Sequence, residues 1–171
     1  MRTRCTVERV ECSPLLVTGD RPFTLQSPAS IMVWLTRTYT DGRAERAMLE
    51  ICLQEGFRTD GASTFWPISR IVPPWRVHDD RYNAGPVAHD VLYILEGHVA
   101  SDYEPVDLSR EEVDDILRGM WRCWGMSRFL AGCADKAIEL IAGGKEHWGS
   151  DSLDSRQHVQ ATWHTLEDKG D

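Results

Sequence analysis

The sequence lacks the features that would place it in a membrane, on a nucleic acid or in an oxidising compartment. None of its 171 residues belongs to an apolar run close to the roughly 18 residues of a membrane-spanning helix. It has no cluster of lysine or arginine, and its net charge of −8 opposes binding to nucleic acid or to anionic lipid. Its five cysteines include no Cys-x-x-Cys pair and are odd in number, so we expect reduced core cysteines rather than disulfides or a zinc site.

Length and composition indicate one globular domain. The amino-terminal stretch MRTRCTVERVEC has no apolar run after its basic residues, so we expect a protein made in the cytoplasm, without a secretory signal or membrane anchor. A hydrophobic share of 42% and a charged share of 27% allow a core to form. We expect a single domain over residues 1–144, followed by a loosely held polar tail over residues 145–171.

Residues 1–63 are predicted to form strands. The run Ile31 to Thr36 is rich in residues that favour strands, Asp41-Gly42 suits a tight turn, and Ala47 to Leu53 can return antiparallel. The overlapping stretch 44–54 would also suit a helix, so both interpretations stay open there.

An irregular connection is predicted next. The stretch GFRTDGAS, residues 56–63, has two glycines and an Asp-Gly pair, which indicate a bend where the backbone can approach a neighbour closely. Asp60 is interpreted as a turn residue. The proline- and tryptophan-rich residues 65–75 have no period of their own and are predicted to be a loop.

The second half of the chain is predicted to be helical. Pro86 suits a first helical position, Ser109 and Glu112 have the spacing of a capping box, and glycines follow each apolar pattern. The expected helices are Pro86 to Glu96, Ser109 to about Trp124, and Ser127 to Ala142. The resulting fold class is α+β, with an N-terminal β-hairpin or small antiparallel sheet followed by a three-helix C-terminal bundle.

The pattern His-Asp-x-x-Tyr occurs twice, from His78 to Tyr82 and from His89 to Tyr93. The first copy runs into Asn-Ala-Gly-Pro, so it is interpreted as a solvated loop with Tyr82 at a frayed end. The second copy lies inside an expected helix, where His89 and Tyr93 share one side, away from the main apolar stripe. The second copy is therefore the candidate for chemistry.

Asp114 is the expected partner of His89. It lies at the border of the apolar stripe of the following helix, where a carboxylate is partly removed from water and needs a hydrogen-bond donor. Asp115, by contrast, is expected in water. An imidazole oriented by a partly buried acid is what a histidine needs to act as a general base on water.

The same residues also have a structural interpretation. A histidine on a helix is more often a hydrogen-bonded structural residue than a catalyst, and a two-residue His-Asp match arises often by chance. An acidic residue such as Asp114 near a helix N-terminus is favoured by the helix dipole alone.

Three ordered motifs resemble a known family. They are GFRTDGAS at 56–63, AHDVLY at 88–93 and SREEVDDIL at 109–117, with Pro-Pro-Trp at 73–75. They are similar to an uncharacterised family common in phages and prophages, a domain of unknown function whose members carry GFxTDxAS, HDxLY and SRxxAD. The resemblance covers about residues 30 to 142, with Val113 where the family usually has alanine. It implies a phage setting, in the host cytoplasm or in the virion, and no particular activity.

A second resemblance is to phospholipase A₂, whose catalytic helix reads HDxxY and whose next helix supplies an aspartate. This resemblance implies that His89 activates water, that Asp90 ligates calcium, and that Tyr93 and Asp114 hold the imidazole. Calcium would polarise the ester carbonyl and stabilise the oxyanion. The chain lacks the cysteine-glycine signature of that family's calcium loop, and only residues 56–63 could replace it.

Two functions of different classes therefore stay open. One is a phospholipase-like, metal-assisted ester hydrolase that uses His89, Asp90, Tyr93 and Asp114, with calcium as cofactor and phospholipid as substrate. A related alternative is a metal phosphohydrolase that also uses His78. The other function is a non-catalytic phage structural or assembly protein of the virion or tail, in which the polar cluster joins two helices and the partners are other phage structural proteins.

Overall fold

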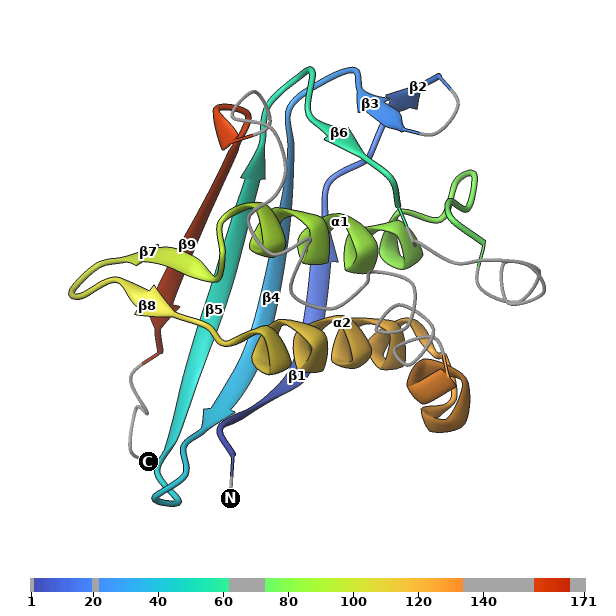
Figure 1. Ribbon diagram of the computed structural model, residues 1–171. Helices are drawn as coiled ribbons and strands as arrows, with labels where there is room; N and C mark the ends of the chain where they lie inside the picture. The colour runs from blue at the N-terminus through green and yellow to red at the C-terminus, as the bar shows by residue number, and fades with distance from the viewer. Residues whose placement is uncertain (1, 20–21, 62–72, 134–155, 167–171) are drawn as a thin grey trace.

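The computed structural model describes residues 2–19, 22–61, 73–133 and 156–166. Two α-helices lie side by side on one face of a six-stranded sheet, and a three-stranded sheet stands at one end (Figure 1). Within these four ranges, no helix is long and apolar enough to cross a membrane.

The large sheet is mixed and has the order β1-β4-β5-β9-β7-β8. Its strands pair antiparallel except for β7 and β9, which run parallel. The small sheet has the order β2-β3-β6. The large sheet contains β1 (Arg4–Cys12), β4 (Ala29–Thr38), β5 (Ala44–Leu53), β7 (His98–Ser101), β8 (Val106–Asp107) and β9 (Val159–Thr165), and the small sheet contains β2 (Val17–Thr18), β3 (Phe23–Leu25) and β6 (Arg58–Thr59).

Strands β4 and β5 form the predicted hairpin. Gly42 in the connecting turn has a φ of 89°, which suits glycine. Ile31 pairs with Ile51 and Val33 with Leu49, and all four side chains are fully buried. Because side chains alternate between the two faces of a strand, the residues between these buried positions face away from this core. The helical alternative for residues 44–54 is therefore wrong.

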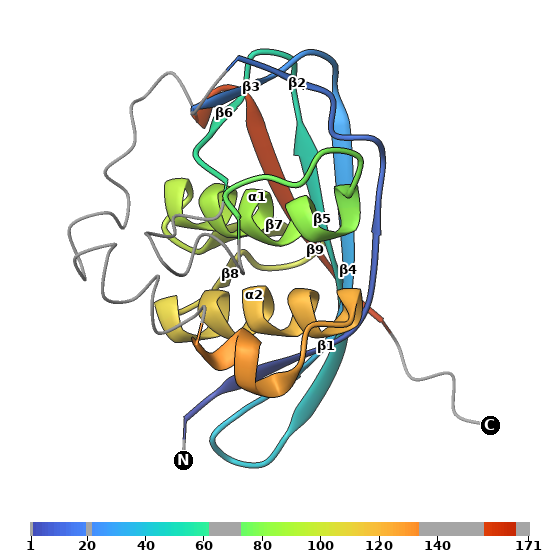
Figure 2. The ribbon, with the colours of Figure 1, turned by 90° about the vertical axis from the view of Figure 1, so that its right-hand side faces the viewer.

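Helix α2 (Arg110–Trp124) forms as predicted from its end signals. The Ser109 side chain accepts a hydrogen bond from the Glu112 backbone N–H, and the Glu112 side chain accepts one from the Ser109 backbone N–H. Gly125 ends the helix in the left-handed conformation, with a φ of 111°. Figure 2 shows α2 beside α1 on the same side of the large sheet.

Helix α1 (Asp80–Ile94) begins earlier than predicted. Asp79 caps it by accepting a hydrogen bond from the backbone N–H of Tyr82, and Pro86 lies inside the helix rather than at its first position. Most of its residues are buried, and the helix packs both on the sheet and against α2, which lies beside it. The start was misplaced because Asn83, Ala84, Gly85 and Pro86 were interpreted as a break in the chain, whereas all four lie inside the buried helix.

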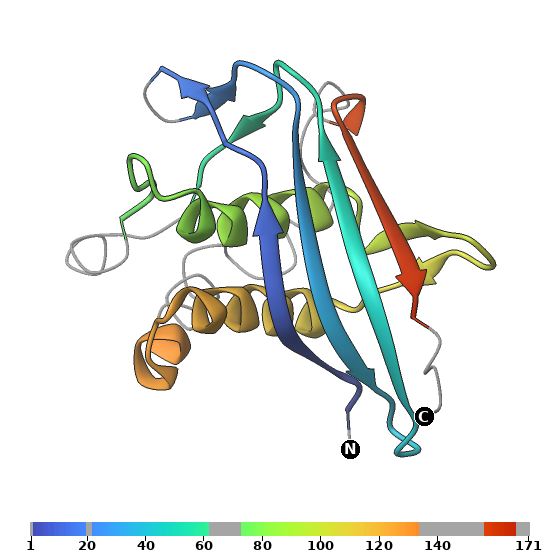
Figure 3. The ribbon, with the colours of Figure 1, turned by 180° about the vertical axis from the view of Figure 1, so that it is seen from behind.

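The predicted three-helix C-terminal bundle is wrong. The protein is mostly β, and α1 and α2 pack on a sheet instead of forming a bundle with a third helix. Residues 128–133 are helical, and the rest of the expected third helix lies outside the described residues. The prediction failed because residues 145–171 were expected to form a loosely held tail. Strand β9 lies within that range and pairs with both β5 and β7. Seen from behind, the far face of the large sheet carries neither α1 nor α2 (Figure 3).

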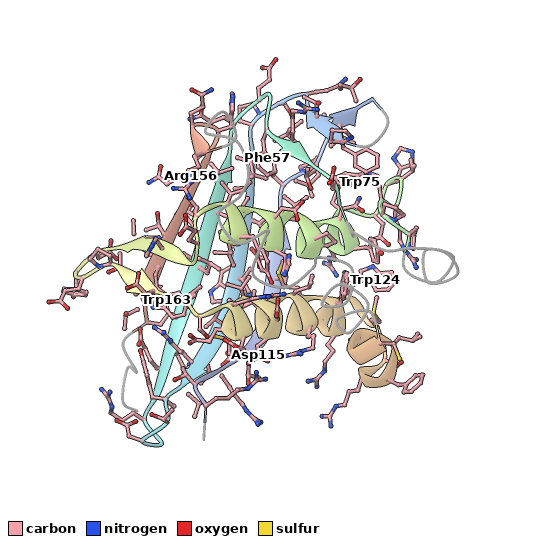
Figure 4. The ribbon with its side chains drawn as sticks, in the orientation of Figure 1. Phe57, Trp75, Asp115, Trp124, Arg156 and Trp163 are labelled. Atoms are coloured by element: carbon pink, nitrogen blue, oxygen red, sulfur yellow. The ribbon has the colours of Figure 1, made fainter. Side chains whose placement is uncertain are left out.

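Strand β9 supplies part of the core. Ala161 and Trp163 of β9 are buried, whereas Thr162 between them is less buried. The Trp163 indole N–H donates to Oε1 of Glu45 at 2.8 Å, which satisfies the polar atom of this buried ring (Figure 4). The alternation in VQATWHT is the signal that could have identified this strand from the sequence.

The glycine-rich stretch bends as predicted. Gly61 has a φ of 64°, and a Cβ atom there would collide with the backbone carbonyl of Pro74. Gly56 has a φ of 88° and lies against the ring of His158. Glycine at these two positions therefore allows Pro74 and His158, which are distant in sequence, to lie close to the bend. Most of the predicted loop at 65–75 lies outside the described residues.

Candidate active site

The candidate site lies between α1 and α2, the two helices that pack against each other on the sheet. Helix α1 carries His89, Asp90 and Tyr93, and α2 carries Arg110 and Asp114. The capping box at Ser109 fixes where α2 begins, so it also sets which residues of α2 face α1.

His89 and Asp114 are in direct contact, as expected from the sequence. Nε2 of His89 lies 3.1 Å from Oδ1 of Asp114. The histidine side chain is only 8% exposed and the aspartate side chain 21%. Nδ1 of His89 has no hydrogen-bond partner among the described residues. One ring nitrogen is therefore held by a carboxylate, and the other is left for a further contact.

Tyr93 and Arg110 extend this contact into a chain. The Tyr93 hydroxyl donates to Oδ1 of Asp114 at 3.1 Å, and Nε of Arg110 donates to the Tyr93 hydroxyl oxygen at 2.8 Å. The rings of His89 and Tyr93 lie with their centroids 4.2 Å apart. Two side chains of α1, His89 and Tyr93, thus contact Asp114, and the Tyr93 hydroxyl also accepts a hydrogen bond from the Arg110 guanidinium.

The surroundings shift the pKa values of two members of this chain. Burial acts to raise the pKa of Asp114, but the hydrogen bonds from His89 and Tyr93 and the nearby charges outweigh it, so the pKa lies below its ordinary value of 3.8. Burial, together with the charge of Asp114, raises the pKa of Tyr93 well above its ordinary value. At neutral pH the aspartate is therefore charged and the tyrosine neutral.

Asp90 belongs to a second contact on the same helix. Its Oδ2 accepts a hydrogen bond from the Thr59 hydroxyl at 2.5 Å, and Oγ1 of Thr59 accepts one from the Gly61 N–H at 3.0 Å. Asp90 thus ties α1 to β6 and the glycine-rich bend. Sequence reasoning missed both Thr59 and Arg110, although each lies inside a quoted motif, GFRTDGAS or SREEVDDIL.

The three motifs meet in space. Thr59 of the first motif contacts Asp90 of the second, and Arg110 and Asp114 of the third contact Tyr93 and His89. Segments that are 25 or more residues apart in the chain are joined by these hydrogen bonds. The motif residues therefore form two polar contacts on α1, one with β6 and one with α2.

The described donors at Asp90 do not fit a calcium site. Calcium takes six to eight oxygen ligands, usually several of them carboxylates. In the part of the chain that the structure describes, no group of three or more His, Cys, Asp or Glu side chains could hold a metal ion. The Asp90 carboxylate already accepts a hydrogen bond from Thr59. Calcium ligation by Asp90 is implied by the resemblance alone and gains no support from the described contacts.

The first His-Asp-x-x-Tyr copy is structural. His78 lies in an exposed turn, as expected, but the prediction that Tyr82 lies at a frayed end is wrong. Asp79 caps α1 and also accepts a hydrogen bond from the Trp124 indole N–H at 2.9 Å. Tyr82 is fully buried, and its hydroxyl donates to the Pro73 carbonyl at 2.6 Å. The two copies therefore differ in role: the first starts a helix, and the second lies in the polar site.

Comparison with known proteins gives one match. A family model described as "Protein of unknown function (DUF1353)" matches residues 36–134, more than half of the chain. The matched range includes every residue of the polar site, from Thr59 to Asp114. No curated protein and no solved structure matches the chain.

Proposed function

The chain belongs to the DUF1353 family, proteins of unknown function, and we propose that the site between α1 and α2 is that of an ester hydrolase in which His89 is the general base. The observation that carries the proposal is the 3.1 Å contact between Nε2 of His89 and Oδ1 of Asp114. A carboxylate on one ring nitrogen fixes the tautomer that presents a lone pair at the other nitrogen.

The reaction follows from this tautomer. Nδ1 of His89 takes a proton from water, the resulting hydroxide adds to the ester carbonyl carbon, and the ester C–O bond breaks. The proton on Nδ1 then passes to the leaving alkoxide, which restores the neutral ring. Asp114, charged at neutral pH, stabilises the imidazolium that exists between these steps. General acid–base catalysis of this kind typically contributes about 10² to 10⁴ in rate.

Tyr93 and Arg110 act as positioning residues in this proposal. The Tyr93 hydroxyl holds the same Asp114 oxygen that faces His89, and Arg110 holds the Tyr93 hydroxyl. A fixed carboxylate keeps the imidazole in one orientation, which matters because small displacements of a base cost large factors in rate.

The substrate class and the setting come from the resemblances. We propose phospholipid esters as substrates, from the similarity to phospholipase A₂, and a phage or prophage setting, in the host cytoplasm or the virion, from the motifs. Calcium is kept as a variable of the experiment, and no step of the reaction depends on it.

The test is hydrolysis of phosphatidylglycerol vesicles and of p-nitrophenyl esters, each with added calcium and with a chelator. We expect His89→Gln to lower the rate by about 10² or more while the fold is retained. His98→Gln is the matched control, because His98 also contacts an aspartate, Asp107 at 2.6 Å, but on an exposed hairpin. Equal rates for the wild type and His89→Gln, or no turnover of any ester by the wild type, would rule out the proposal.

A second candidate is a structural role in phage assembly, with other phage proteins as partners. It is favoured by one observation, that His89, Tyr93, Arg110 and Asp114 bond to one another across the helix pair and so join α1 to α2. Under this alternative, His89→Gln lowers the free energy of unfolding and no ester is hydrolysed by the wild type. Chemical denaturation of the same variants therefore separates the two functions.

A further inference from the structure

A groove lies on the side of α2 that faces β1, separate from the contacts with α1. It has a volume of about 430 Å³ and is lined by residues of β1, of α2 from Asp115 onwards and of the helical segment 128–133. Gly119 allows the helix to approach the strand this closely, because a Cβ atom there would collide with the Val7 side chain. Asp115 lies on α2 where the helix passes β1 (Figure 4).

The charge of the groove is opposite to that of the protein. Three arginines line it, Arg118, Arg122 and Arg128, against one acidic residue, Asp115. The chain as a whole carries a net charge of −8. Arginines gathered in a concave surface of an acidic protein create a local positive potential that attracts an anion.

Two of these arginines have no acidic partner among the residues that the structure describes. Asp115 pairs with Arg118 and with Arg2, so the single carboxylate of the groove is already matched. Arg122 and Arg128 are exposed and form no ion pair with any residue that the structure describes. Arg122 in the last turn of α2 is favoured by the helix dipole, but Arg128 lies beyond that helix and is not.

From this juxtaposition we propose that the groove binds a phosphate ester. Arg122 and Arg128 bind the phosphate, for which the guanidinium group has matching geometry. The ligand is either a free sugar or glycerol phosphate or the headgroup of a glycerophospholipid, which share this chemistry. The proposal does not depend on ester hydrolysis by His89.

The first experiment is calorimetric titration of the full chain with glycerol 3-phosphate and, separately, with inorganic phosphate. We expect glycerol 3-phosphate to bind, and Arg122→Gln and Arg128→Gln each to weaken binding roughly tenfold, as expected for loss of a charge-assisted hydrogen bond. Arg43→Gln is the matched control, because it removes the same charge from the exposed β4–β5 turn. Absence of binding, or equal weakening by Arg43→Gln, overturns the proposal.

Alkylation of cysteines locates the binding site. Cys123 lines the groove, whereas Cys52 is exposed on β5. Glycerol 3-phosphate should slow the reaction of Cys123 with iodoacetamide and leave that of Cys52 unchanged, as read by peptide mass spectrometry. Protection of both or of neither overturns the assignment to this groove.

Vesicles distinguish the two sources of the ligand. Sedimentation with phosphatidylglycerol vesicles, lost in the Arg122→Gln/Arg128→Gln double variant, identifies a lipid headgroup as the ligand. Binding of glycerol 3-phosphate without sedimentation identifies a free phosphate ester. Sedimentation that the double variant retains contradicts the role of both arginines.

Discussion

Arg37 of β4 and Glu112 of α2 form a buried ion pair, with Nε of Arg37 donating to Oε1 of Glu112 at 2.8 Å. Their side chains are 13% and 3% exposed. Glu112 is also the residue whose side chain closes the capping box at Ser109. One carboxylate thus both starts α2 and fixes that start to the sheet, which places Arg110 and Asp114 opposite α1.

Breaking this pair should destabilise the protein strongly. Glu112→Gln keeps a side chain that can complete a capping box but leaves Arg37 buried without a counter-charge, and loss of one partner of a buried pair costs about 3–5 kcal/mol. Urea unfolding measures the change. Asp41→Asn, which breaks the exposed Asp41–Arg43 pair, is the control and should cost less than about 1 kcal/mol. Similar effects of the two variants would contradict this explanation.

Acid should remove the contribution of Asp114 to stability. The pKa of Asp114 in the folded protein lies below its ordinary value of 3.8. Its stabilising effect is therefore fully present above that ordinary value and is lost as the pH falls through the lower, folded-state value. We expect the wild type to exceed Asp114→Asn in free energy of unfolding at neutral pH, and the difference to shrink towards about pH 2. A difference that does not change with pH would show that no charge effect is involved.

The cysteines should react according to their burial. Burial raises the pKa of the Cys5 thiol far above its ordinary value of 9.0, so its reactive thiolate is suppressed in the folded state. Cys52, Cys123 and Cys133 are exposed. We expect iodoacetamide to modify these three in the native protein and Cys5 only in denaturant. Labelling of native Cys5 at the rate of Cys52 would contradict the burial of β1 against α2.

The core should depend on β9. Trp163 is 1% exposed, and replacing a buried tryptophan by alanine typically costs about 3–5 kcal/mol. We therefore expect Trp163→Ala to lower the midpoint of urea unfolding markedly. Thr162→Ala, at a less buried neighbouring position of the same strand, is the control. A midpoint unchanged in Trp163→Ala would mean that β9 is not part of the stable sheet.

Local signals in the sequence predicted local structure well. The Ser109–Glu112 capping box and Gly125 gave the bounds of α2, and Asp41-Gly42 gave the β4–β5 hairpin. These features depend on residues close together in the chain. Their stabilising contacts can therefore be recognised without knowing the fold.

Features that depend on distant contacts were harder to predict. The strand β9 is short, and its polar outer residues resemble a solvated tail unless the sheet is known. Asp115 was expected in water, but its side chain is 11% exposed because α2 packs on β1. The cysteines were expected in the core, and Cys5 and Cys12 do pack there, but Cys52, Cys123 and Cys133 are exposed.

The polar site was predicted in part. The spacing of His89 and Tyr93 and the border position of Asp114 anticipated that these residues meet, because helical periodicity fixes their directions. Their roles in a reaction stay a prediction. Arg110 and Thr59 were not foreseen, because which cation or hydroxyl reaches a site depends on how α2 and β6 dock, which periodicity does not determine.

The position of β9 constrains when the sheet can be assembled. The β5–β9 pairing joins Leu53 to Val159 and Ala47 to Thr165, so more than a hundred residues separate the two sides of each contact. During synthesis on the ribosome, β5 and β7 must wait with unpaired edges until residues 159–165 emerge. Contacts so distant in sequence make folding slow, so these two edges stay exposed for longer than the edges within the local β4–β5 hairpin.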